Sequence, residues 1–255
     1  MPDPVRAEVL GRFARAALEA GEGEVCALFQ RSFYLLCPGN RFACVGERSL
    51  GRGPLNVFVD RFAPPKIGER ISIALDGAQD WQPPRIDAGA APNVAALRAA
   101  ARRAPAEGLG GLVAGRQNAL ASHGQPAIDA LGTWLSGHAL GEEAGELLGL
   151  GPGLTPSGDD YLGGMLVALR ACGRATHADS LWRWLEPRLA ARTSPLSAAH
   201  LAAAAAGEAH EALHECLAAV FGGGDLEAAL DRLDAVGHCS GWDALAGAAA
   251  VLQTT

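Results

Sequence analysis

Aromatic residues are scarce in this 255-residue chain, at 5% of the sequence, while glycine and alanine are abundant. A core with few large rings favours close helix–helix contacts through small side chains. No apolar run approaches the roughly 20 residues that a membrane-spanning helix needs. The opening residues, MPDPVRAEVL, are charged and mixed and do not resemble a signal peptide. We therefore predict a cytoplasmic protein with no membrane partner.

Positive charge is also in short supply, since the formal net charge is −7. This balance argues against a nucleic-acid partner, because nucleic-acid phosphates attract basic surfaces. With 49% hydrophobic and 19% charged residues, the chain can still bury a sizeable core.

Cys-x-x-Cys pairs are absent, although the chain has six cysteines: Cys26, Cys37, Cys44, Cys172, Cys216 and Cys239. Most of them lie inside apolar runs, and a chain without an export signal is not expected to form disulfides. The pattern predicts buried thiols in preference to disulfides or zinc ligands.

The first part of the chain has the alternating apolar runs of β-strands. A helix is predicted over 5–20, where Val5, Val9 and Phe13 share one face. Turn signals then separate predicted strands at 25–29, 32–37, 42–45, 55–59 and 71–75. We expect a mostly antiparallel sheet with sandwich or barrel character.

The rest of the chain has helical periodicity. Residues 81–92, WQPPRIDAGAAP, favour a linker, so we predict a β-rich domain over 1–88 and a helical domain over 89–255. The predicted helices are 93–103, 109–122, 126–136, 139–148, 157–172, 177–192, 195–206, 208–221, 225–236 and 241–252. The fold class is therefore α+β, with a β-rich N-terminal part and an all-helical C-terminal part.

The most specific motif is the run Gly149–Gly164, GLGPGLTPSGDDYLGG, which opens an apolar helix. Its glycines and prolines predict a tightly defined turn. Ser157 is a good N-cap, and two acids fall in the first helical turn. Such a loop can direct backbone N–H groups at an anion or carboxylates at a cation. The alternative is a buried loop followed by a well-capped helix.

A second motif, Gly237–Gly247, GHCSGWDALAG, has the same residue pattern before the last helix. His238 could carry a proton or donate to an anion, or be a hydrogen-bonded turn residue only. If the two helix N-termini meet at one cleft, they provide positive potential for a phosphate or carboxylate.

We predict that the two loops form one pocket. The catalytic candidates are Asp159, Asp160 and His238. The candidates for binding substrate or anion are Gly151, Gly153, Thr155, Ser157, Gly158, Asn56, Ser197, Ser240 and Asp243. Asn56 would extend from a strand-connecting turn and Ser197 from the first turn of a helix, and both positions also suit purely structural roles. No cofactor is firmly indicated, but Asp159 and Asp160 could bind Mg²⁺ or another cation.

A different motif, His210-Glu211-Ala-Leu-His214, matches the zinc-protease pattern H-E-x-x-H. The extended form needs a glycine and a third histidine, but Leu217 and Val220 stand at those places. An apolar stripe also runs beside the two histidines. We therefore interpret the match as accidental, although a carboxylate from a distant Glu or Asp could still supply a third zinc ligand.

Taken together, the motifs resemble the AllH family, formerly catalogued as a domain of unknown function and now regarded as a subunit of oxamate carbamoyltransferase. The resemblance rests on Gly149–Asp160, Gly53–Asn56, Gly237–Asp243, and Ser197 with the alanine-rich run to Gly207, in that family's order. It spans roughly residues 25–252.

The resemblance implies carbamoyl transfer between carbamoyl phosphate and oxamate, giving oxalurate and phosphate, in anaerobic allantoin degradation, a part of purine catabolism. It also implies partner subunits and a small anionic substrate. Neither central motif contains a basic residue, so Arg52, Arg192, a cation or a partner subunit must supply positive charge. Two alternatives are a non-catalytic structural or ligand-sensing subunit, and a stand-alone metal-dependent hydrolase or kinase-like phosphate-binding enzyme.

Overall fold

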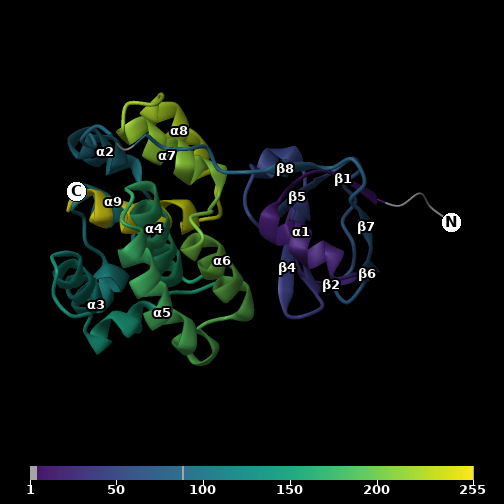
Figure 1. Cartoon of the computed structure of the whole chain (residues 1–255), viewed down its shortest axis with the longest axis horizontal. Coiled ribbons are helices and arrows are strands. Elements are labelled where there is room, and N and C mark those ends of the chain that lie inside the picture. The colour runs from purple at the N-terminus through teal and green to yellow at the C-terminus, as the bar shows by residue number, and fades with distance from the viewer. Residues whose placement is uncertain (1–4, 88, 255) are drawn as a thin grey trace. The chain divides into compact units, whose positions relative to one another are not determined.

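The structure is a computed structural model that describes residues 5–87 and 89–254 (Figure 1). The chain divides into two compact units, one ending at Pro83 and the other beginning at Pro84. The predicted boundary, at residue 88, lies outside the described residues, a few positions further along the chain. The first unit is β-rich and the second helical, which confirms the predicted α+β class.

The N-terminal unit is a nearly closed mixed sheet. Its strands are β1 (Val5–Gly11), β2 (Gly23–Leu28), β3 (Ser32–Cys37), β4 (Arg41–Gly46), β5 (Asn56–Val59), β6 (Arg70–Ile71), β7 (Ile73–Ala74) and β8 (Gln79–Trp81). The strand order is β6-β2-β3-β4-β5-β1-β7, and β8 also pairs with β1. Only Ser72 separates β6 from β7, yet these strands lie at opposite ends of that order. The chain therefore almost joins the two edges, which confirms the barrel character.

Both pairing directions occur within this sheet. The pairs β1–β5, β2–β3, β2–β6 and β3–β4 are antiparallel. The pairs β1–β7, β1–β8 and β4–β5 are parallel. A short 3₁₀ helix, η1 (Arg48–Leu50), and the loop after it connect β4 to β5.

The helix predicted over 5–20 is wrong in its first half. Val5–Gly11 is the strand β1, and only α1 (Arg12–Glu19) is helical. Because β1 pairs with β5, β7 and β8, distant strands satisfy its backbone and override the local helical pattern. The helix α1 buries Ala14, Ala17 and Leu18 in the core of the sheet.

The second unit is helical. Its elements are α2 (Val94–Ala100), η2 (Ala101–Arg103), η3 (Gly110–Ala114), α3 (Ala119–Leu135), η4 (Glu142–Leu147), α4 (Ser157–Ala171), α5 (Ala175–Arg192), α6 (Pro195–Ala205), α7 (Glu211–Val220), α8 (Leu226–Asp234) and α9 (Ser240–Leu252). Across the described part of the chain, no helix is both long and apolar enough to span a bilayer.

Three predicted helix boundaries need correction. The predicted helix 109–122 is interrupted at Gly115, which has a left-handed conformation. Asn118 then caps α3 by accepting from Ala121 N–H at 2.8 Å. The predicted helices 109–122 and 126–136 are therefore η3 and one continuous α3. Pro156, not Ser157, is the N-cap of α4, and Ser157 is its first helical residue.

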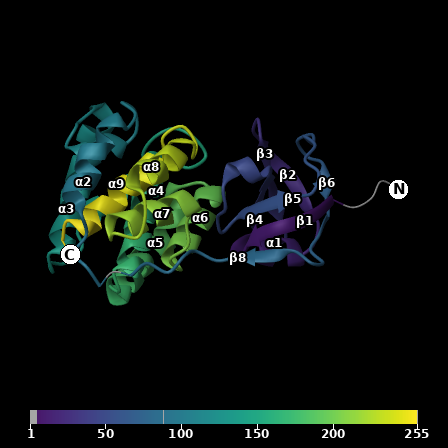
Figure 2. The same ribbon diagram turned by 90° about the horizontal axis from the view of Figure 1, so that it is seen from above.

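The centre of the helical unit is the contact between α4 and α9, which lie side by side in both views (Figures 1 and 2). A Cβ on Gly164 would lie 1.7 Å from the carbonyl oxygen of Ala244. A Cβ on Gly247 would lie 1.8 Å from the carbonyl oxygen of Tyr161. The two backbones therefore touch, as the abundance of small residues predicts.

We expect Gly247→Ala to destabilise the protein by about 2 kcal/mol or more, because the new methyl group overlaps a backbone carbonyl that cannot rotate away. For a domain of this size, that corresponds to a fall in Tm of about 4–8 °C. Thermal unfolding followed by circular dichroism measures it. Gly132→Ala is the matched control, since nothing lies within 4 Å of the position that its methyl group would take in α3. Equal Tm values for the two variants would contradict the proposed contact.

Candidate functional site

The two glycine-rich motifs come together at the crossing of α4 and α9. Thr155 lies just before α4 and Ser240 begins α9, and their hydroxyl oxygens are 3.1 Å apart. The loop between η4 and α4 needs glycine at Gly149, whose φ is +76° and whose Cβ would lie 2.2 Å from the Arg192 carbonyl oxygen. The predicted convergence of the loops is therefore present in the structure.

Asp160 is the carboxyl group at the centre of this crossing. Its Oδ2 atom is buried and has no hydrogen-bond partner among the described residues. Burial raises the pKa of Asp160 well above its usual range, and the charges of Asp243 and Asp159 add to the rise. The hydroxyls of Ser240 and Thr155 partly oppose it. A buried acceptor without a partner is costly, so this oxygen marks a place where a ligand or a proton can bind.

Asp243, in the first turn of α9, connects that helix to a third loop. Its Oδ1 atom accepts from the backbone N–H groups of Leu109 at 2.5 Å and Gly110 at 3.0 Å. Burial raises the pKa of Asp243 to about 6, while the Ser157 hydroxyl and these two N–H groups oppose the rise. Gly108 adopts a φ of +69°, and a Cβ there would lie 2.5 Å from Asp243 Oδ1.

The sequence prediction did not include this third loop, residues 107–110. Its only local signal is the glycine-rich Gly108–Gly111, GLGG. That run resembles the two motifs in composition but lacks their hydroxyls and acids.

Asp159 has a different environment from Asp160. Its Oδ1 accepts from Gly149 N–H at 2.8 Å, and its Oδ2 accepts from the Ser197 hydroxyl at 2.6 Å and from the Thr193 hydroxyl. Both oxygens are therefore occupied, and the side chain joins the first motif to the start of α6. This geometry supports an anchoring role for Asp159 and Ser197 more than direct contact with a substrate.

The remaining candidates of the first motif are also engaged in the turn. Gly151 packs against Ser157, whose backbone nitrogen would lie 3.0 Å from a Cβ at Gly151, while Gly153 is exposed and has open space around it. Gly158 is buried, donates its N–H to Leu150 O at 2.9 Å, and would place a Cβ 2.0 Å from Leu147 O. The N–H groups of Asp159 and Asp160 bond to Pro156 O. Several of the amides that the sequence predicts for an anion are thus used within the chain.

His238 lies at the exposed edge of the second motif. A ring nitrogen of His238, a carboxylate oxygen of Glu107 and the sulfur of Cys239 lie within 4.8 Å of one another. We call these three residues the ligand cluster. Cys239 is partly buried and Cys26 is exposed, so the prediction of buried thiols holds for Cys37, Cys44 and Cys216 only, although all six cysteines are free.

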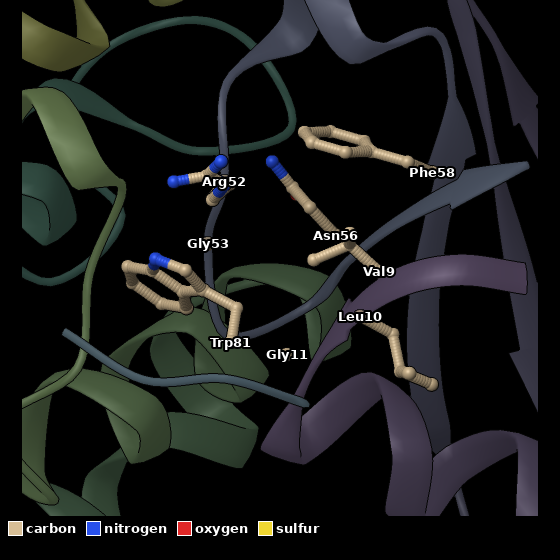
Figure 3. Close-up of a pocket in the computed structure, with 8 residues that line it drawn as sticks. All are labelled: Val9, Leu10, Gly11, Arg52, Gly53, Asn56, Phe58 and Trp81. Carbon is tan, nitrogen blue, oxygen red and sulfur yellow. The ribbon is translucent and has the colours of Figure 1, made fainter. Parts of the chain in front are cut away.

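Asn56 lies in the N-terminal unit, beside a narrow surface recess (Figure 3). The recess is lined by Val9, Leu10, Gly11, Arg52, Gly53, Asn56, Phe58 and Trp81. Asn56 donates from its side-chain amide to Gly51 O at 2.8 Å. A Cβ on Gly11 would lie 2.2 Å from Gly53 O, and Pro54 O accepts from Ala14 N–H at 2.9 Å. Within its unit, the Gly53–Asn56 motif therefore covers the start of α1.

Arg52 and Arg192, the two basic residues predicted as possible sources of positive charge, belong to different units of the chain. Arg192 forms an ion pair with Glu146 at 3.3 Å on the surface of the helical unit. Arg52 belongs to the N-terminal unit, where its side chain borders the recess beside Asn56 (Figure 3).

The H-E-x-x-H residues do not present a zinc-protease arrangement. His210 is the N-cap of α7, and its Nδ1 accepts from Ala212 N–H at 3.2 Å. His214 is 3% exposed, and its Nε2 accepts from Ala209 N–H at 3.1 Å. His210 therefore lies at the end of the helix and His214 is buried, so the two do not share one exposed helix face. This supports the interpretation of the motif match as accidental.

The model of a protein family described as "Oxamate carbamoyltransferase subunit AllH" matches residues 147–252. The match confirms the resemblance over this segment, which contains both motifs at the α4–α9 crossing and ends with α9. The Gly53–Asn56 motif and the loop 107–110 lie outside it. No curated protein and no solved structure matches the chain.

We expect Asp159→Asn to lower the free energy of unfolding by about 2–3 kcal/mol, because charge-assisted hydrogen bonds from Thr193 and Ser197 lose their anionic acceptor. Urea unfolding measures this change. Asp129→Asn is the control, since Asp129 is exposed on α3 and bonds only within its helix, to Gln125. A loss as small as that of the control would show that Asp159 is not an anchor.

His214 should make the protein sensitive to acid. Burial lowers the pKa of His214 to about 4, with the charge of His210 as a second cause. Because the unfolded imidazole titrates near 6.5, the unfolded state binds the extra proton first. The stability that the neutral His214 side chain contributes is fully present above pH 6.5 and is lost as the pH falls towards 4. At pH 5 the loss is about 2 kcal/mol.

The variant His214→Gln keeps an acceptor for Ala209 N–H. Between pH 7 and pH 5, its free energy of unfolding should fall by about 2 kcal/mol less than that of the wild type. Burial also lowers the pKa of His200 to about 4, so part of the acid sensitivity should remain. Urea unfolding at the two pH values measures the difference. His123→Gln, on the exposed face of α3, is the control and should follow the wild type.

Proposed function

We propose that this chain is a subunit of an oxamate-type carbamoyltransferase, which transfers a carbamoyl group between carbamoyl phosphate and oxamate. The observation that carries the proposal is the buried Asp160 oxygen without a partner, beside the Thr155–Ser240 hydroxyl pair and inside the family-matched segment. The family's description as a subunit favours an assembly with other chains. Because the family resemblance implies allantoin degradation, we extend the proposal to that pathway.

In this reaction the amide nitrogen of oxamate attacks the carbamoyl carbon. A C–N bond forms, the C–O bond to phosphate breaks, and the nitrogen loses one proton. Negative charge develops on the carbamoyl oxygen, which needs preorganised donors. The hydroxyls of Thr155 and Ser240, which both act on Asp160, can serve as such donors. The exposed His238 imidazole is our candidate acceptor for the proton.

The protonation state of Asp160 matters for these anionic substrates. Its raised pKa favours the neutral carboxylic acid, which can donate a hydrogen bond, or its proton, to an oxygen of the phosphate leaving group. The N-terminal ends of α4 and α9 add partial positive charge at the same crossing. Both effects support binding of a small anion.

Asp160→Asn should reduce phosphate-dependent oxalurate cleavage by the reconstituted complex at least about 100-fold, because Asn cannot exchange a proton with the substrate. The change is nearly isosteric, so subunit assembly and Tm should stay within error of the wild type. Asp129→Asn is again the matched control. Wild-type turnover in an intact Asp160→Asn complex would sink the catalytic assignment.

A second candidate is a non-catalytic structural subunit, which the fully bonded Asp159 favours. It predicts that Asp159→Asn weakens assembly while Asp160→Asn leaves turnover per complex unchanged. Gly158→Ala is unsuitable for this comparison, because its methyl group would overlap Leu147 O and disturb the fold itself. Turnover by the isolated chain on a phosphorylated or hydrolysable substrate would favour a stand-alone enzyme.

A further inference from the structure

The ligand cluster brings three metal-binding atoms from two loops to the start of α9. Glu107 lies in the third loop, and His238 and Cys239 directly precede α9. Their ligand atoms lie within 4.8 Å of one another. The ligand atoms of a tetrahedral zinc ion are about 3.5 Å apart, given bonds of about 2.0–2.3 Å. Small side-chain rotations would therefore place all three around one ion.

We propose that Glu107, His238 and Cys239 bind a divalent zinc-class cation through one oxygen, one nitrogen and one sulfur atom. Thiolate and imidazole ligands select zinc over magnesium or calcium, which prefer oxygen. Three protein ligands leave a fourth position for water or a substrate, as in catalytic zinc sites. On binding, the Cys239 thiol releases its proton to solvent and a sulfur–metal bond forms, with no change of oxidation state.

The backbone on both sides of Glu107 is fixed by side chains from elsewhere in the helical unit. The Asn118 amide group donates to Ala106 O at 2.8 Å and to Gly108 O at 2.7 Å. Asp243 accepts from the two N–H groups that follow Gly108. An exposed glutamate on a loop held this closely fits a ligand better than a freely moving surface charge.

The other two ligands are fixed by the start of α9. Gly237 turns the chain with a φ of +60°, and Gly241 N–H donates to Val236 O at 3.2 Å across the turn. His238 is exposed and Cys239 is partly buried, so an ion can enter from solvent and still reach the sulfur.

The charges around the ligand cluster favour a cation. Burial raises the pKa of the Cys239 thiol to about 11, and the carboxyls of Asp243, Glu107 and Asp160 add to the rise, in that order. One of these, Asp160, has the buried oxygen without a hydrogen-bond partner. A divalent ion would offset this negative charge and give the site the positive charge that both motifs lack. That last role rests on the proposed function, whereas metal binding itself does not. With a cation bound, His238 is a ligand and no longer the proton acceptor.

The test uses the purified full-length chain, stripped with a chelator and titrated with Zn²⁺ against a chromophoric competitor. We expect one zinc per chain, and at least tenfold weaker binding in each of Cys239→Ser, His238→Gln and Glu107→Gln. Cobalt should give a thiolate-to-metal charge-transfer band that Cys239→Ser removes. The controls Cys172→Ser and His138→Gln, a partly buried cysteine and an exposed histidine, should bind like the wild type.

Two results would overturn the inference: wild-type protein without stoichiometric zinc, or undiminished binding by the folded triple variant. Loss of zinc on His210→Gln alone would also overturn it, by placing the ion at the H-E-x-x-H residues. Thermal unfolding of the metal-free variants shows whether each is folded. A chain that binds no zinc, in a complex that still needs Asp160 for turnover, would refute the metal site and leave the proposed function standing.

Discussion

The contact between the backbones of α4 and α9 is the constraint on which the candidate site depends. Helices with ordinary side chains at their crossing stay about 8–10 Å apart. At Gly164 and Gly247 even one methyl group would overlap the opposing carbonyl oxygen. This close approach lets the short hydroxyl side chains of Thr155 and Ser240 meet at 3.1 Å. The site is thus built on backbone packing, and its geometry follows from residues that have no functional groups.

Three aspartates at this crossing show how environment separates one residue type into different roles. Asp159 accepts hydrogen bonds on both oxygens and joins the first motif to α6. Asp243 binds two backbone N–H groups and fixes the loop before η3. Asp160 keeps a buried oxygen without a partner. Two of the three carboxyls therefore serve the fold, and the third, Asp160, is the one that the proposed function uses.

Local chemistry explains which features the sequence could predict. The two motifs and the α-helices after residue 156 follow from glycine, proline, hydroxyl and acidic residues acting over a few positions. The strand β1 could not be predicted this way, because its partners β5, β7 and β8 lie far along the chain. The loop around Glu107 was missed for the same reason: it is fixed by Asp243, 133 residues away from Gly110. The general prediction of buried thiols also covered Cys239 and spoke against a zinc ligand there, whereas Cys239 lies beside Glu107 and His238.

Electrostatics sets the condition under which this crossing can hold an anion. Each helix N-terminus contributes about half a positive charge, so the two together balance about one carboxylate. Burial raises the pKa of Asp160 and brings that of Asp243 to about 6, and each proton bound removes one negative charge. Arg192 forms its ion pair with Glu146 instead. Anion affinity at neutral pH must therefore come from a protonated carboxyl, from a cation in the ligand cluster, or from a basic residue outside the two motifs. The protonated carboxyls and the cation are coupled sources of anion affinity. A cation beside Asp160 and Asp243 favours their ionised forms, so it displaces their protons and supplies positive charge in their place.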